Sequence, residues 1–299
     1  MSLATLGEIP NLAESFSAEE SLEMFRRMCL TRYFEMRLIK AYKDGLIKVP
    51  IYLSIGQESI SAAVATMISG YYIFAQHRAH SVYLAFGGNP VKLIDELLGL
   101  PTGCSAGMGG SPSIQDPDIK MIGHHGLIGE NVPLAVGAAL GAPDAGVVSF
   151  FGDAAAEEDY VFASMGFALT HKLKVLFVCE DNNLSILTPK SDRRSWEIAD
   201  ATRSIGMPTA DIGDDPWLIA HYTRQFSSNL PAFLNCRTCR HHWHVGTGID
   251  NPPEWDRFTL VKEQLDAFGL SSRADKIEAE TKQYVENLWN ERLPILSGK

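Results

Sequence analysis

Residues 147–153 read VVSFFGD, and residues 175–183 read VLFVCEDNN. Each stretch opens with a run of β-branched, aromatic and aliphatic residues without polar alternation, as expected for a parallel strand buried on both faces. The segment between them has an apolar stripe at helical spacing, made of Val161, Met165, Ala168 and Leu169. The pattern predicts a strand–helix–strand unit with a right-handed crossover. Both strand ends, Asp153 and Asn182-Asn183, would then lie at one edge of the sheet.

The flanking sequence predicts further elements around this unit. Residues 18–43 have the alternation of apolar and charged groups of an amphipathic helix, and residues 57–69 are rich in small residues, as in a closely packed helix. Residues 232–235 form a third apolar stretch. We therefore expect an α/β fold with a mostly parallel sheet and helices on both faces.

The size and composition of the chain restrict its class. Its 299 residues, 45% of them hydrophobic, can bury one sizeable core. We expect a single domain over residues 1–299, with entry helices at about 15–70 and a closing helix at about 274–292. A net charge of −10 argues against nucleic acid as a ligand, because nucleic-acid binding needs a positive field.

Membrane insertion and secretion are also not indicated. No apolar run approaches the roughly 18 residues of a bilayer span, and residues 1–14 lack the basic and apolar regions of a signal peptide. The five cysteines are too scattered for a disulfide framework and are typical of free thiols. We expect a cytoplasmic protein with a small-molecule substrate.

Oxygen donors at two neighbouring strand ends suggest a site for a metal and a phosphate. Mg²⁺ prefers hard oxygen ligands in an octahedron and often shares them with phosphate. Asp153 could supply a carboxylate and Asn182 an amide oxygen, leaving positions for phosphate oxygens. Either residue alone would more often be a helix cap or part of a turn. The paired pattern favours the metal site.

The sequence resembles the α subunits of thiamine diphosphate-dependent 2-oxo acid dehydrogenases over about residues 20–295. Those proteins carry Gly-Asp-Gly and, after a similar spacer, Asn-Asn or a close variant. Here Gly152-Asp153-Ala154 is followed, after the 27 residues 155–181, by Asn182-Asn183. Motifs like the family's R-x-F-E-x-R, G-Q-E, G-K-G-G-S and G-I-V-G with V-P occur at Arg32–Arg37, Gly56–Glu58, Gly107–Ser111 and Gly126–Pro133.

This resemblance implies a role for each matching residue. Asp153, Asn182 and the backbone carbonyl of Leu184 would bind Mg²⁺, while Arg78 and Arg194 would contact the diphosphate of thiamine diphosphate. The planar fork of a guanidinium suits that task, because it can pair two phosphate oxygens. The full cofactor-binding set implied is His77, Arg78, Gly126, Ile128, Gly152, Asp153, Ala154, Ala155, Asn182, Leu184 and Arg194.

Further roles concern the pyrimidine and proton transfer. Gly126 and Ile128 match residues that meet the aminopyrimidine, and a core position for Ile128 is the alternative. The resemblance implies that His80 and His244 are catalytic, since histidine titrates nearest to neutral pH. His125 matches a glycine-flanked histidine of some members.

The chain also departs from the family pattern. Ala154 replaces a glycine, His77 replaces a tyrosine, and Asp159, Ala163 and Gly166 replace glycine, glutamate and asparagine. These positions bear on cofactor affinity and subunit contact.

A zinc site is a competing interpretation of the late loop. Cys236 and Cys239 form a C-x-x-C pattern that His241, His242 and His244 follow. The absence of a second C-x-x-C weakens this interpretation.

The activity implied by the resemblance is decarboxylation of a 2-oxo acid and transfer of the remaining unit to an acceptor. A carboligase or transketolase-like half-subunit and a noncatalytic regulatory subunit are the alternatives. Glycine-rich loops and the strand–helix–strand unit occupy residues 99–183, and the rest of the sequence contains no second set of buried strands that could form a pyrimidine domain. We therefore expect a β-type partner that carries this domain and its catalytic glutamate, in an α₂β₂ assembly.

Overall fold

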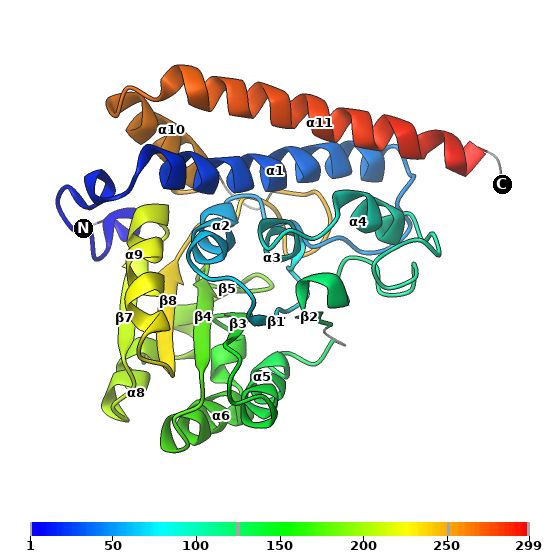
Figure 1. Ribbon diagram of the computed structural model, residues 1–299. Coiled ribbons are helices and arrows are strands. Elements are labelled where there is room, and N and C mark those ends of the chain that lie inside the picture. Colours follow the sequence, from blue (N-terminus) through cyan, green and yellow to red (C-terminus); the bar gives the residue numbers. More distant parts are fainter. Residues whose placement is uncertain (1, 124–125, 250–251, 298–299) are drawn as a thin grey trace.

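The computed structural model describes residues 2–123, 126–249 and 252–297. Within them, six strands form one parallel sheet in the order β2-β1-β3-β4-β8-β7 (Figure 1). A separate antiparallel hairpin pairs β5 (Leu184–Ser185) with β6 (Thr188–Pro189). The strands of the sheet are β1 (Tyr72–Phe74), β2 (Met121–Ile122), β3 (Val147–Gly152), β4 (Val175–Asp181), β7 (Thr209–Gly213) and β8 (Ala232–Arg237).

Helices pack on both faces of the sheet, which confirms the predicted fold class. Val148 and Phe150 of β3 belong to one hydrophobic core, whereas Val147 and Phe151 belong to the other, because successive strand residues face opposite sides. The smaller core includes α5 (Asn131–Gly141), α6 (Asp159–Thr170) and α8 (Ile198–Ser204). The larger one includes α1 (Ala18–Lys43), α2 (Glu58–Met67), α3 (His80–Ala85), α4 (Pro90–Leu97), α9 (Pro216–Ser227), α10 (Arg257–Ala267) and α11 (Ser271–Ser297).

The longest helices, α1 and α11, lie side by side on the outside of the larger core (Figure 1). Helix α1 begins with a capping box, in which the Ser17 hydroxyl accepts from the Glu20 amide and the Glu20 carboxylate accepts from the Ser17 amide. Short 3₁₀ turns lie at Leu3–Thr5, Leu12–Ser15, Pro117–Ile119 and Ala155–Glu157, and the four-residue helix α7 spans Lys190–Arg193.

The structure confirms the predicted strand–helix–strand unit. β3 and β4 are parallel neighbours joined through α6, and β8 lies on the other side of β4. The predicted helices at 18–43 and 57–69 correspond to α1 and α2, and the closing helix is somewhat longer than predicted. The single-domain assignment stays a prediction.

Two other expectations concern cysteines and membranes. The five cysteines are free thiols, as predicted. Among the described residues, no helix is both long and apolar enough to cross a bilayer.

Candidate active site

A cavity of about 180 Å³ lies at the carboxyl ends of β1, β3, β4 and β8. Open α/β sheets bind ligands at this edge, because the loops that follow the strands diverge there. Its wall includes many of the residues predicted from sequence: His77, Arg78, Ile128, Gly152, Asp153, Ala154, Ala155, Asn182, Leu184 and His244. The fold therefore brings together residues that are up to 167 positions apart, from His77 to His244.

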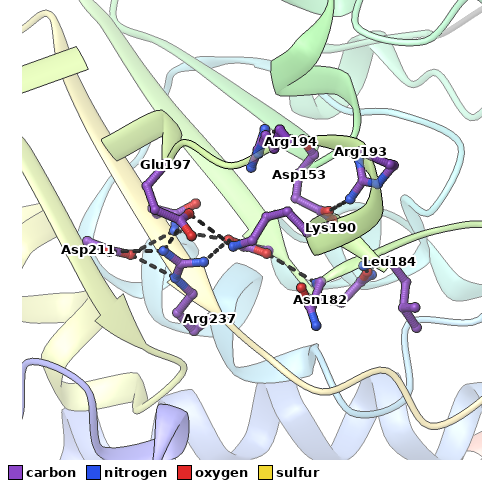
Figure 2. A network of polar contacts seen from close by, with 12 residues as sticks. Asp153, Asn182, Leu184, Lys190, Arg193, Arg194, Glu197, Asp211 and Arg237 are labelled. Atoms are coloured by element: carbon purple, nitrogen blue, oxygen red, sulfur yellow. Dashed lines mark hydrogen bonds and ion pairs between the residues drawn. The ribbon is translucent and has the colours of Figure 1, made fainter. Parts of the chain in front are cut away.

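Asp153 follows β3 directly, and its side chain is 1% exposed. Its carboxylate forms an ion pair with Arg193, and its backbone carbonyl accepts from Arg194 at 3.1 Å (Figure 2). Burial and the nearby Asp181 carboxylate raise the pKa of Asp153 to about 6, although the two arginines act in the opposite direction. This carboxylate is thus ionised at neutral pH, and Arg193 is its cationic partner, so a metal ion bound here would share the carboxylate with that guanidinium or displace it.

Asn182 follows β4 and reaches the same cavity. Its side-chain oxygen accepts from the Leu184 amide at 3.1 Å, and its side-chain nitrogen donates to the Gln57 oxygen at 3.0 Å. These two bonds define which atom of the amide is the oxygen. The turn at Asn183 has a left-handed backbone with φ of 65°, which asparagine tolerates better than most residues.

Arg78 and His244 also belong to the wall. The Arg78 guanidinium donates to the carbonyls of Leu53 and His244, the second at 3.1 Å. Burial and the charge of Arg240 lower the pKa of Arg78 to about 10, which leaves it charged at neutral pH. Burial, Arg78 and Arg240 lower the pKa of His244 to about 4, so its imidazole is neutral at pH 7.

Aromatic contacts hold the two cavity histidines. The rings of His77 and His244 have centroids 5.1 Å apart, and Tyr52 contacts both at 4.7 and 5.4 Å. The Tyr52 amide donates to the Ser111 hydroxyl at 3.0 Å, which places this ring cluster relative to the glycine-rich loop.

His80 lies outside the set of described residues that line the cavity. It is fully buried, with Nδ1 2.9 Å from the Glu35 carboxylate and Nε2 2.8 Å from the Ser111 hydroxyl. Glu35 also accepts from the Ser54 amide at 2.8 Å. His80 thus connects α1 with two loops near the cavity, and its contacts indicate a positioning role. The catalytic role remains a prediction.

The remaining predicted residues are placed differently. Gly126 and Arg194 are not among the described residues that line the cavity, and His125 lies outside the described residues altogether. Gly126 has a φ of 103°, a conformation that favours glycine. The Arg194 guanidinium stacks 4.7 Å from the Trp196 ring and has Nε and Nη2 buried without a hydrogen-bond partner.

Sequence reasoning missed Gln76 and Glu180, which also line the cavity. Gln76 has a buried amide nitrogen and Glu180 a buried oxygen, both without a hydrogen-bond partner. Burial raises the pKa of Glu180 to about 8, although Arg78 lowers it. The sequence signal that could have identified them is their position: Gln76 directly precedes His77, and Glu180 directly precedes Asp181, each near a strand end. Buried polar atoms without partners are rare, and here they indicate a wall built for a polar ligand.

The late loop gives no support to the zinc interpretation. Cys236 lies in β8 within the larger core, and Cys239 accepts from the Glu254 amide at 3.2 Å. Within the parts of the chain that the structure describes, histidine, cysteine and acidic side chains form no group of three or more that could hold a metal.

Fold and site together define an α/β protein with a polar ligand cavity at the carboxyl edge of a parallel sheet. The family model described as "Dehydrogenase E1 component" matches residues 26–251. This chain belongs to the dehydrogenase E1 component family.

Individual relatives agree with this assignment. A pyruvate dehydrogenase E1 component subunit alpha of Rickettsia felis is 30% identical over 90% of this chain and 89% of its own length. The alpha subunit of acetoin:2,6-dichlorophenolindophenol oxidoreductase of Bacillus subtilis is 29% identical over 77% and 73%. Mitochondrial pyruvate dehydrogenase E1 component subunit alpha-2 of Arabidopsis thaliana is 28% identical over 80% of this chain but 63% of its own length. The chain thus spans less than two thirds of such plant relatives.

Proposed function

We propose that this chain is the α subunit of a thiamine diphosphate- and Mg²⁺-dependent enzyme that decarboxylates a 2-oxo acid and passes the remaining unit to an acceptor. The observation that carries this proposal is the common cavity of Asp153, Asn182, Arg78 and His244. Membership of the E1 family supports it. The relatives bear dehydrogenase or oxidoreductase names, which gives no support to the carboligase or transketolase-like alternative.

The residues present fit a magnesium diphosphate group. Asp153 supplies a carboxylate with 1% exposure, and Asn182 and Leu184 adjoin it in the wall. Arg78 supplies a positive charge for diphosphate, and Gln76 has an amide nitrogen with no partner. In this proposal Asp153, Asn182 and the Leu184 carbonyl hold Mg²⁺, and Arg78 holds diphosphate.

The chemistry that bound thiamine diphosphate supplies is stabilisation of the electron pair released on decarboxylation. The chain's own residues bind, orient and shield the reacting groups. His244 is a neutral imidazole that can accept a proton at the cavity wall, and Arg78 next to it disfavours the charged imidazolium. His80 holds the loops around this wall in place through its contacts with Glu35 and Ser111.

A β-type partner in an α₂β₂ assembly is part of the proposal. A cavity of about 180 Å³ is smaller than the roughly 300–1,000 Å³ of whole-ligand pockets, so this chain would enclose only part of the cofactor. Ile186, which lines the cavity, is 59% exposed, and the neighbouring Leu187 is 60% exposed. Exposed apolar groups at a ligand site support an interaction surface. A cytoplasmic location stays a prediction.

Calorimetric titration of thiamine diphosphate, with and without Mg²⁺, tests the proposal on the chain together with its copurified partner. We expect metal-dependent binding that Asp153→Ala abolishes, since that carboxylate is the charged ligand proposed for the ion. His244→Ala should retain cofactor affinity and lower turnover. Undiminished metal-dependent binding by Asp153→Ala would refute the site. Absence of binding in the unaltered protein would favour a noncatalytic subunit.

A further inference from the structure

A network of charged side chains, most of them buried, joins the carboxyl ends of β4 and β8 to β7, next to the proposed metal site (Figure 2). Asp181 accepts from the Lys190 amine at 2.9 Å and from the Arg237 guanidinium at 2.5 Å. Glu197 accepts from the same two cations at 3.0 and 2.9 Å. Asp211 accepts twice from Arg237, at 3.0 and 3.1 Å. Three carboxylates thus share two cations.

The network joins the sheet to one loop. Asp181 is the last residue of β4, and Arg237 is the last residue of β8. Lys190 belongs instead to residues 183–194, which we call the 183–194 loop and which contains β5, β6 and α7. The backbone amide of Lys190 donates to the Asn183 carbonyl at 3.0 Å and closes the base of the loop. The side-chain amine of the same residue donates to Asp181 at the end of β4.

This loop carries groups that the proposed function uses. Leu184 and Ile186 line the cavity, and Arg194 donates to the Asp153 carbonyl at 3.1 Å. The Asp181 carboxylate also accepts from the Asn183 amide at 3.1 Å. The strand end, the turn after it and the base of the loop therefore meet at a single carboxylate.

We propose that Lys190 is a positioning residue, whose ion pair with Asp181 holds the 183–194 loop against β4 and so keeps Leu184 and Arg194 at the cavity. The expected effect on cofactor binding rests on the proposed function. The contact between the loop and β4 does not depend on that function. The side chain of Lys190 is 10% exposed and that of Asp181 is fully buried. Without Lys190, Asp181 would keep Arg237 as a cationic partner, but the side-chain link between the loop and β4 would be lost. The effect should therefore be largest at the loop that Lys190 anchors.

The test compares variants of the full chain, together with its copurified partner, by hydrogen–deuterium exchange and by titration with thiamine diphosphate and Mg²⁺. Lys190→Met removes the charge at similar size, and Lys190→Arg restores a cation. Lys174→Met is the matched control, because Lys174 precedes β4 at the opposite end of the strand from Asp181 and is exposed. Glu197→Gln is a milder second variant, since Glu197 is 39% exposed and contacts the same amine.

For Lys190→Met we expect amides of the 183–194 loop to exchange about tenfold faster and cofactor affinity to fall about tenfold, which corresponds to about 1.4 kcal/mol. Lys190→Arg should recover most of both, Glu197→Gln should show a smaller change in the same loop, and Lys174→Met should show neither.

Unchanged exchange in the loop of Lys190→Met would overturn the proposal. Uniformly faster exchange over the whole chain would also overturn it, because Lys190 would then be a general stability residue. If Lys190→Met does not fold, Lys190→Gln, which removes the same charge but keeps a polar side chain, decides the matter by the same loop-specific readout. If the unaltered chain with its partner binds no cofactor, the proposed function fails, while the exchange measurements still report on the loop contact.

Discussion

Acidic pH should weaken divalent-cation binding through protonation of Asp153. This carboxyl is 1% exposed, and burial together with Asp181 raises its pKa from 3.8 to about 6. Because a carboxylate must be ionised to bind a metal, Asp153 should cause no further change in apparent affinity above pH 7, and the affinity should fall about tenfold for each pH unit below 6. A carboxyl with an ordinary pKa would show this bend about two units lower, near pH 4.

The assay is titration of thiamine diphosphate with Mn²⁺ or Mg²⁺ between pH 5 and 8, on the chain with its partner. Between pH 7.5 and 5 we expect about a tenfold loss of apparent affinity. Asp153→Asn should reduce binding at every pH and remove the bend near pH 6. Glu180→Gln should retain this bend, since the pKa of Glu180 is about 8 and lies outside the acidic limb.

An affinity that stays flat from pH 8 to 5 would refute this reasoning. The same acidic bend in Asp153→Asn would refute it as well, because some other group would then be responsible. His244, with a pKa of about 4, titrates below the range used.

Three further predictions concern stability. The pKa of Glu180 is raised from 4.5 to about 8, so between these pH values the folded state keeps a proton that the unfolded state releases. The free energy of unfolding should therefore fall as pH rises through this range, by up to about 1.4 kcal/mol per pH unit. Glu180→Gln should show a shallower slope of Tm against pH, and an unchanged slope would contradict the assignment. Glu96 accepts from the amides of Ser105, Gly107, Gly109 and Gly110 at 2.7 to 2.9 Å, so Glu96→Gln should cost about 1–3 kcal/mol in unfolding free energy and expose this loop to limited proteolysis. His80→Ala should lower the unfolding free energy by about 3 kcal/mol in chemical denaturation, because Glu35 and Ser111 would lose a buried partner; an unaffected denaturation midpoint would argue against its positioning role.

The sequence by itself determined the central unit of the fold and the ends of its two main strands. The runs at 147–151 and 175–179 are contiguous and, apart from Ser149, apolar, so their conformation depends on neighbours in the chain and on burial on both faces. Once both are parallel strands, geometry alone brings Asp153 and Asn182 to one edge.

Short strands could not be found in this way. β1 has three residues, Tyr72–Phe74, and β7 has five, Thr209–Gly213, so neither is long enough to show a pattern distinct from a loop. They become strands because β3 and β8 offer them backbone partners. Gln76 reaches the cavity only because β1 pairs beside β3.

The tertiary structure alone decided which charged groups meet. His80 matches a motif at the cavity, yet the fold buries its ring between Glu35 and Ser111, which are 45 and 31 positions away. Arg237 meets Asp181 across 56 positions. Such pairs produce no periodic pattern in the sequence. An ion pair requires only that two side chains lie close together in the folded protein, and the packing of the whole chain determines which side chains do so.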